Sequence, residues 1–140
     1  AGKAYENNPF NVPDLVVEAT VTPPTVTGAS VSATSGMLGD PLTITMSGQD
    51  DQGISSIWLY FDTPSGGTKR FYCDLSGVTS GSCSITRTFG TGDDFSAAGT
   101  YTYSHMNAAD VWNTYTAGSY AGKAYENNPF NVPDLVVLGN

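Results

Sequence analysis

One segment of this chain occurs twice. Residues 1–17, with the sequence AGKAYENNPFNVPDLVV, return letter for letter as residues 121–137, an offset of 120 positions in a chain of 140. So long a run of identities does not arise by chance or from shared fold pressure. Either the chain comes from a tandem array with a period near 120 residues, or one terminal segment was copied to the other end. Both interpretations predict a single module plus a spare piece, which points away from a self-contained enzyme.

Charge and composition narrow the class of protein. Five Lys and Arg stand against thirteen Asp and Glu, for a formal net charge of −8. Such a surface repels phosphate, which argues against nucleic acid and anionic membranes as partners. Divalent cations are its natural counterpart, although acidity also simply keeps an exported protein soluble. The chain is rich in Thr, Ser, Gly, Val and Tyr, which favours strands. No apolar run approaches the ~20 residues of a membrane helix.

Short runs of alternating apolar and polar residues, separated by turns, predict an all-β fold. Seven or eight strands at a spacing of roughly 8–12 residues are typical of a β-sandwich. The segment 117–125 has room for one or two helical turns at most. The expected strands are residues 26–33, 42–46, 54–61, 69–75, 82–89, 99–106, 111–116 and 130–132.

The two cysteines, Cys73 and Cys83, flank a Gly- and Ser-rich stretch that is expected to be a hairpin turn. A disulfide across it closes a loop of about ten residues and contributes roughly 2–3 kcal/mol. It also predicts an oxidising, exported setting. Two buried free thiols are the alternative.

Four stretches together resemble the immunoglobulin-like repeats of bacterial surface and secreted proteins. They are TPPTVTGASVS, GDPLTITMSGQDDQGISSIWLYFDTPSGG, AAGTYTYSHMNAADVWNTYT and PFNV, and the resemblance covers about residues 22–133. It implies an immunoglobulin-like β-sandwich of 7–8 antiparallel strands and a structural or adhesive role outside the cell. One departure is Asp110-Val111-Trp112-Asn113, which stands where the family usually has Asp-x-Ala-Gly-Asn.

The resemblance also divides the chain. Residues 1–21 become the closing strand and linker of a preceding repeat, 22–134 the domain, and 135–140 an exit linker. The predicted function is a non-enzymatic repeat module of a bacterial surface protein that contacts neighbouring repeats or a cell-surface ligand. The alternative is an accessory carbohydrate-binding domain of a secreted enzyme.

Calcium is the candidate cofactor. In a sandwich of this topology the two acidic loops and the N-terminal linker lie at one end. Asp50, Asp51 and Asp110 are therefore expected to converge with Glu18 or Asp14 and to offer the several oxygen ligands that Ca²⁺ requires. The competing interpretation is that Asp50 and Asp51 cap a turn through side-chain hydrogen bonds.

Aromatic side chains offer a second kind of site. Trp112 and Tyr115 lie in or beside a loop and are candidates for stacking on a sugar, whereas Trp58 is in the most apolar strand and is expected to be buried. Catalysis has little support, since His105 is the one histidine of the chain and its neighbour Ser104 is expected on the opposite face of a strand.

The duplication itself predicts strand exchange. Two copies of one closing strand compete for one position. The C-terminal copy has the shorter connection, so closing its loop costs less entropy. Phe10 and Val12 of the N-terminal copy correspond to Phe130 and Val132, and both gain from burial. A spare strand that fills the equivalent position of a neighbour links chains head to tail.

Overall fold

The computed structural model describes residues 6–7, 9–14, 22–91, 95–117 and 122–139. Their regular structure consists of six strands and no helix, so the all-β prediction is confirmed. The strands are β1 (Thr25–Val31), β2 (Ser35–Met37), β3 (Pro41–Asp62), β4 (Thr68–Thr88), β5 (Gly99–Asp110) and β6 (Leu135–Leu138).

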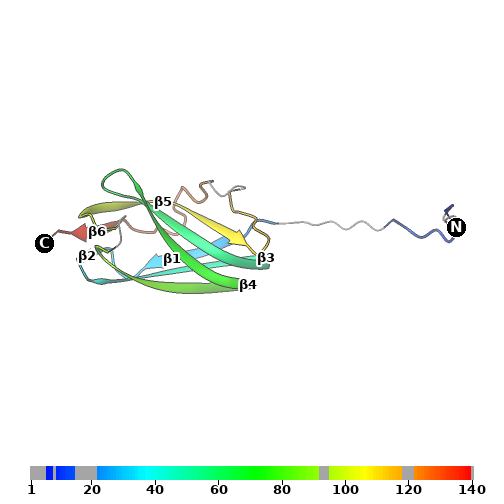
Figure 1. Cartoon of the computed structure of the whole chain (residues 1–140), viewed down its shortest axis with the longest axis horizontal. Helices are drawn as coiled ribbons and strands as arrows, with labels where there is room; N and C mark the ends of the chain where they lie inside the picture. The colour runs from blue at the N-terminus through cyan, green and yellow to red at the C-terminus, as the bar shows by residue number, and fades with distance from the viewer. Residues whose placement is uncertain (1–5, 8, 15–21, 92–94, 118–121, 140) are drawn as a thin grey trace.

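The six strands form one curled, mixed sheet in the order β1-β3-β5-β6-β2, with β4 paired to β3 (Figure 1). All pairings are antiparallel except that of β2 with β6. The first part of β3 pairs with β1 and the end of β4, whereas its second part pairs with β5 and the start of β4. β3 and β4 thus run as a long hairpin through both walls of the curled sheet.

A bend in this hairpin allows β3 and β4 to contribute to both walls of the curled sheet, one on each side of the bend. The β3–β4 register shifts between Gln49 and Ile54, next to Gly53 with φ of +116°. On β4 the residues Ser76 and Gly77 have φ of +58° and +80°, which lie in the left-handed region. A Cβ atom at Gly53 would collide with the backbone carbonyl of Gly77. Glycine is therefore required where the two bent strands cross most closely.

The core lies inside the curl of the sheet. Along β3 the residues Leu42, Ile44 and Met46 are fully buried, and Ile57, Leu59 and Phe61 repeat the same period of two after the bend. A cluster of aromatic rings fills the space between the walls, with edge-to-face contacts of Phe95 against Phe71 and Tyr101 at 5.6 and 5.0 Å. Leu42, Ile44 and Met46 are the core face that their alternation predicts.

Several predicted assignments of strands, turns and linkers are wrong. Residues 111–116 form turns and a single bridge from Tyr115 to Ala109, because β5 ends at Asp110. Phe130–Val132 forms a turn and an irregular stretch instead of the last strand, and Leu135–Leu138, expected in an exit linker, forms β6. The residues between Cys73 and Cys83 belong to β4 and form no hairpin turn. Part of the expected helical segment 117–125 lies outside the described residues, and the rest is not helical.

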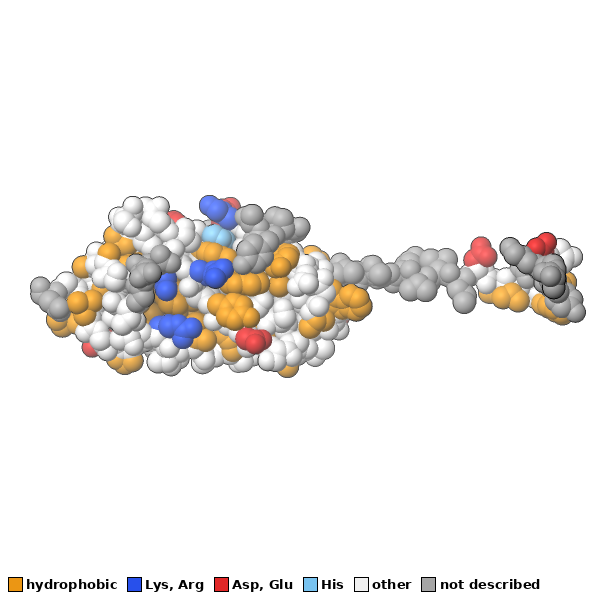
Figure 2. Space-filling model, in the orientation of Figure 1, with side chains coloured by type: hydrophobic (Ala, Val, Ile, Leu, Met, Phe, Trp, Pro, Cys, Tyr) orange, Lys and Arg blue, Asp and Glu red, His pale blue; other side chains and the backbone are white. Residues whose placement is uncertain are grey.

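The domain has two distinct ends. The proximal end is where β1 begins at Thr25 and β5 finishes at Asp110, and the distal end holds the start of β5 at Gly99 together with β2 and β6 (Figure 1). Hydrophobic side chains are visible at both ends of the body (Figure 2). Within the part of the chain that the structure describes, no helix is long and apolar enough to cross a membrane.

Candidate functional site

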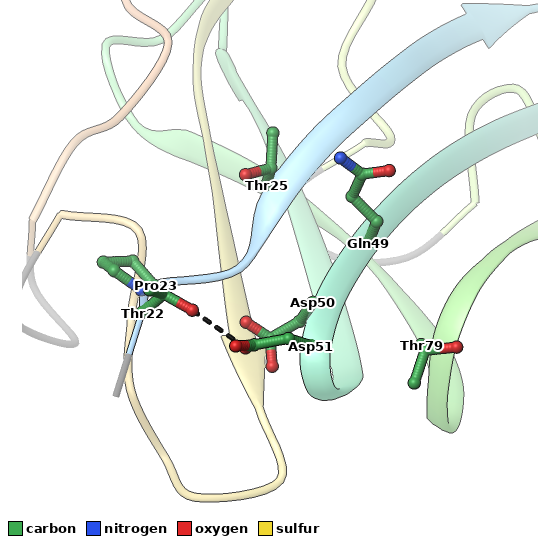
Figure 3. Close-up of a pocket in the computed structure, with 7 residues that line it drawn as sticks. All are labelled: Thr22, Pro23, Thr25, Gln49, Asp50, Asp51 and Thr79. Atoms are coloured by element: carbon green, nitrogen blue, oxygen red, sulfur yellow. Dashed lines mark hydrogen bonds between the residues drawn. The ribbon is translucent and has the colours of Figure 1, made fainter. Parts of the chain in front are cut away.

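The proximal end carries an open pocket of about 420 Å³ where the chain enters the domain (Figure 3). Thr22 donates a hydrogen bond from Oγ1 to Oδ1 of Asp51 at 2.8 Å, which ties the start of the domain to the bend of β3. The pocket is lined by Thr22, Pro23, Thr25, Gln49, Asp50, Asp51 and Thr79.

Asp50 is a turn cap. Its side chain is only 6% exposed, and Oδ2 accepts hydrogen bonds from the backbone N–H groups of Gln52 at 2.9 Å and Gly53 at 3.1 Å. These bonds fix the bend of β3 and confirm the capping interpretation for this residue. The other oxygen, Oδ1, is buried and has no hydrogen-bond partner among the described residues.

Asp110 repeats this arrangement on the neighbouring loop. It is fully buried, and Oδ1 accepts from the backbone N–H groups of Trp112 at 2.9 Å and Thr114 at 2.8 Å. Its Oδ2 atom, like Oδ1 of Asp50, is buried without a hydrogen bond inside the described part of the chain. The two loops meet through the backbone N–H of Val111, which donates to the carbonyl of Gly53 at 2.9 Å.

The expected convergence of Asp50, Asp51 and Asp110 with Glu18 or Asp14 is not seen in the described part of the chain. No group of three or more His, Cys, Asp or Glu residues suited to a metal ion occurs there. Glu18 lies outside the described residues, and Asp14 is exposed in the N-terminal copy. Calcium binding therefore stays a prediction, now resting on Asp50 and Asp110, each of which presents one carboxylate oxygen without a hydrogen bond among the described residues.

The aromatic candidates fall into two groups. Trp112 is 67% exposed on its loop, as predicted. Tyr115 packs instead beside Trp58, with ring centroids 6.2 Å apart, and Tyr72 lies on Trp58 at 5.7 Å. Trp58 is 9% exposed, in agreement with the expectation of burial. The two predicted stacking residues thus have different surroundings.

Ser104 and His105 are closer than simple alternation allows. The β3–β5 register shifts between the pairs Tyr60–His105 and Phe61–Tyr103, so Ser104 is the extra residue of a bulge. Its Oγ lies 2.8 Å from Nδ1 of His105. The imidazole stacks on Tyr60 at 4.1 Å, and desolvation, then the positive charge of Lys123, lowers the pKa of His105.

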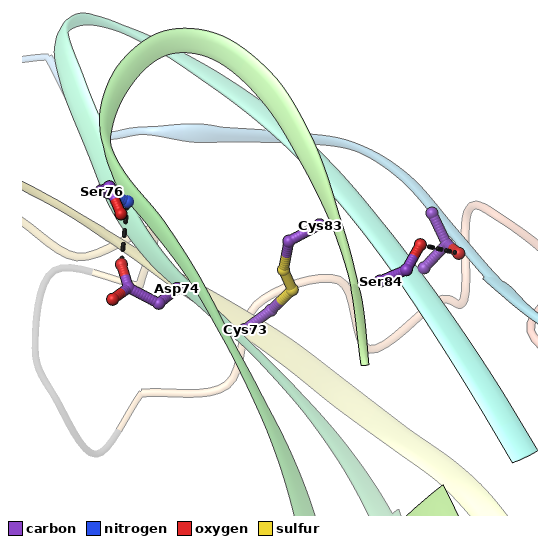
Figure 4. The surroundings of a disulfide bond; sticks show 6 residues. Cys73, Asp74, Ser76, Cys83 and Ser84 are labelled. Atoms are coloured by element: carbon purple, nitrogen blue, oxygen red, sulfur yellow. Dashed lines mark hydrogen bonds between the residues drawn. A yellow bond between two sulfur atoms is a disulfide. The ribbon is translucent and has the colours of Figure 1, made fainter. Parts of the chain in front are cut away.

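Cys73 and Cys83 form a disulfide (Figure 4). Their β3 partners are Ile57 and Met46, on opposite sides of the bend. The disulfide therefore connects the two halves of β4 across the arch that Figure 4 shows, with Cα atoms 6.2 Å apart. The sequence predicts this disulfide between two strands of a simple hairpin, whereas in the structure it connects two parts of the single strand β4.

The C-terminal copy of the repeated segment completes the domain. Val132 is 3% exposed, and Phe130 packs partly against the core. The hydroxyl of Tyr125 accepts a hydrogen bond from the backbone N–H of Val26 on β1 at 3.0 Å. The hydroxyl of Tyr103 on β5 donates to the carbonyl of Tyr125 at 2.6 Å.

The described residues of the N-terminal copy adopt the turns of the C-terminal copy in a different environment. Asn11 and Asn131 both have φ of +51°, and both Pro-Phe pairs, 9–10 and 129–130, form turns. Yet Phe10 is 74% exposed and Val12 is 62% exposed. The sequence of the segment fixes its turns, whereas its burial depends on the domain around it.

Comparison of the chain with protein-family models, with curated proteins and with solved structures gives no match.

Proposed function

We propose that this chain is a non-enzymatic structural module of an exported bacterial surface protein, with an immunoglobulin-like sandwich formed by the two walls of the curled sheet. The observation that carries the proposal is the position of the repeated segment. The segment ends in β6 at the distal end, and its other copy precedes β1 at the proximal end. In an array with the period of 120 residues, each module follows the previous one end to end.

The disulfide and the charge support an extracellular setting for such a module. Disulfides persist where thiols are not kept reduced, which is the case outside the cell. A net charge of −8 keeps neighbouring arrays apart and soluble.

The test uses three proteins that contain one, two or three consecutive copies of residues 18–137. Each protein begins with a single copy of residues 1–17. Since β5 alone spans about 36 Å, the maximum dimension from small-angle X-ray scattering is expected to grow by a constant step of at least that size per module. A dimension that levels off because modules fold back on one another contradicts the proposal.

Calcium at the proximal end is the second part of the proposal. Asp50 and Asp110 hold buried carboxylate oxygens without a hydrogen bond among the described residues, and a buried anionic oxygen is costly unless a cation or donor satisfies it. Ca²⁺ at about 100 times its dissociation constant adds about 2.7 kcal/mol of stability.

The matched variant for calcium is Asp110→Asn, which keeps an oxygen for the turn cap and removes the charge. We expect Ca²⁺ to raise the melting temperature of the natural protein relative to a chelator, and to have no effect on the variant. Equal melting temperatures of the natural protein with Ca²⁺ and with chelator exclude the calcium site.

Carbohydrate binding is the alternative function, and the exposure of Trp112 is the observation that favours it. Glycan-array binding that is lost in Trp112→Ala but kept in Tyr72→Ala, a control at another exposed aromatic residue, supports this function. A protein without glycan hits, or with hits that both variants keep, rules it out.

A further inference from the structure

The structure contains a strand position whose occupying sequence occurs twice in the chain. β6 lies between β5 and β2, pairing antiparallel with residues 99–101 and parallel with residues 35–37. Without β6, both neighbours lose their partner at this place in the sheet. Its occupant belongs to residues 121–137, and residues 1–17 carry the same sequence. The sequence that fills this strand slot is therefore present a second time, with Glu18 standing where the 43% exposed Leu138 is.

The N-terminal copy cannot reach the slot of its own domain. In the slot, Val137 pairs with Gly99 at the distal end, so Val17 would have to lie there too. Thr22 is held at the proximal end by Asp51, and the 12 residues of β5 separate these ends by about 36 Å. The five residues from Val17 to Thr22 reach at most about 18 Å when fully extended. Even if Thr22 were released, the eight residues to β1 would reach about 28 Å.

We propose that copies of this chain associate head to tail, with residues 1–17 of one chain occupying the slot between β5 and β2 of the next. The donor segment replaces residues 121–137 of the acceptor and makes the same contacts. The acceptor's own N-terminal copy stays available for a third chain, so the assembly is an open polymer. This inference goes beyond the role of a passive spacer and does not depend on the immunoglobulin-like identity.

The two ends of the domain suit such a junction. Because only residues 18–21 lie between Val17 and Thr22, the proximal end of the donor lies within about 18 Å of the distal end of the acceptor. Both ends expose apolar side chains, which are then brought face to face. They are Val78, Val111 and Trp112 at the proximal end, and Met37, Leu38 and Leu138 at the distal end, with exposures between 42% and 67%.

Competition decides how much polymer forms. The chain's own C-terminal copy is tethered to the slot, so its effective concentration exceeds that of a neighbour's segment in dilute solution. The natural protein is therefore expected to be mainly monomeric when dilute and to form oligomers as its concentration rises. A change that damages only the C-terminal copy shifts this competition toward the neighbour's segment.

The test uses the full chain with one pair of substitutions placed in either copy. Leu135→Asp with Val137→Asp puts charges into the slot, and Leu15→Asp with Val17→Asp is the matched control in the other copy. The first variant is expected to be folded and polymeric, with a light-scattering mass that rises with concentration. The control is expected to stay monomeric at every concentration. The variant with all four substitutions lacks any intact copy, so it should lose the near-UV circular dichroism of the folded domain.

A synthetic peptide of residues 1–17 distinguishes specific polymers from aggregates. Added in excess to the Leu135→Asp, Val137→Asp variant, it should fill the slots and return the mass to that of one chain with one peptide. The proposal is overturned if this variant is monomeric and folded, if it is as unfolded as the fourfold variant, or if the peptide leaves its mass unchanged.

Discussion

The repeated segment allows one stability prediction to be made with an internal control. Val132 is 3% exposed in the C-terminal copy, and Val12, with the same sequence neighbours, is 62% exposed. Val132→Ala removes two buried methyl groups, about 1.6 kcal/mol of transfer free energy, and the cavity left behind brings the cost to about 2 kcal/mol or more. Val12→Ala changes a mostly exposed side chain and is expected to stay within about 0.5 kcal/mol.

Urea unfolding followed by tryptophan fluorescence measures the difference, at protein concentrations low enough for monomers. With a urea slope of about 1.5 kcal/mol per molar, Val132→Ala should lower the midpoint by about 1.3 M, and Val12→Ala by less than about 0.4 M. Equal shifts of the two midpoints would refute the assignment of the slot to the C-terminal copy. A larger shift for Val12→Ala would place the N-terminal copy in the slot.

Three further predictions concern the disulfide and two titratable side chains. Reduction should lower the free energy of unfolding by about 2–3 kcal/mol, and a variant with Ala at Cys73 and Cys83 should no longer respond to dithiothreitol. The pKa of His105 is lowered by desolvation, so the unfolded chain takes up the proton first as the pH falls. Stability should therefore fall as the pH drops below about 6.5, more steeply than in His105→Gln; identical slopes in urea titrations would exclude this role. Burial raises the pKa of Tyr103 to about 12, so this tyrosine should ionise last when tyrosine absorbance is followed with rising pH. Tyr103→Phe should remove that last ionisation and lower the free energy of unfolding by about 1 kcal/mol, because the hydrogen bond to the carbonyl of Tyr125 is lost.

The core could be predicted from the sequence because alternation is a local signal. Before the bend the apolar residues of β3 alternate and burial follows that pattern, whereas after the bend a continuous apolar run marks a buried strand. The bend itself could not be predicted, since Gln49–Gly53 is polar and contains glycine, as ordinary loops do. The bend is held within a strand by its flanking residues, because Gln49 and Ile54 pair with Ser80 and Val78 of β4, which comes later in the chain.

The closing strand was misplaced for a related reason. Phe130–Val132 matches the closing strand that the resemblance implies, which places Leu135–Leu138 in the linker that follows. The burial of this segment does alternate, with Leu135 and Val137 buried and Leu138 43% exposed. What makes it a strand is pairing with β5 and β2, which come from distant parts of the sequence. At the acidic loops, Asp50 could be predicted as a cap, but the matching role of Asp110 depends on where β5 ends.

Comparison of the two copies shows which features of the segment come from its own sequence and which come from tertiary packing. Asn11 and Asn131 adopt the same left-handed conformation although the valines that follow them differ in exposure from 62% to 3%. Asparagine tolerates this conformation and proline fixes φ, so these turns arise without the core. A segment whose turns are already formed loses less conformational entropy when it enters a slot. The same local chemistry that closes the domain in cis therefore makes the N-terminal copy a prepared donor for a second chain.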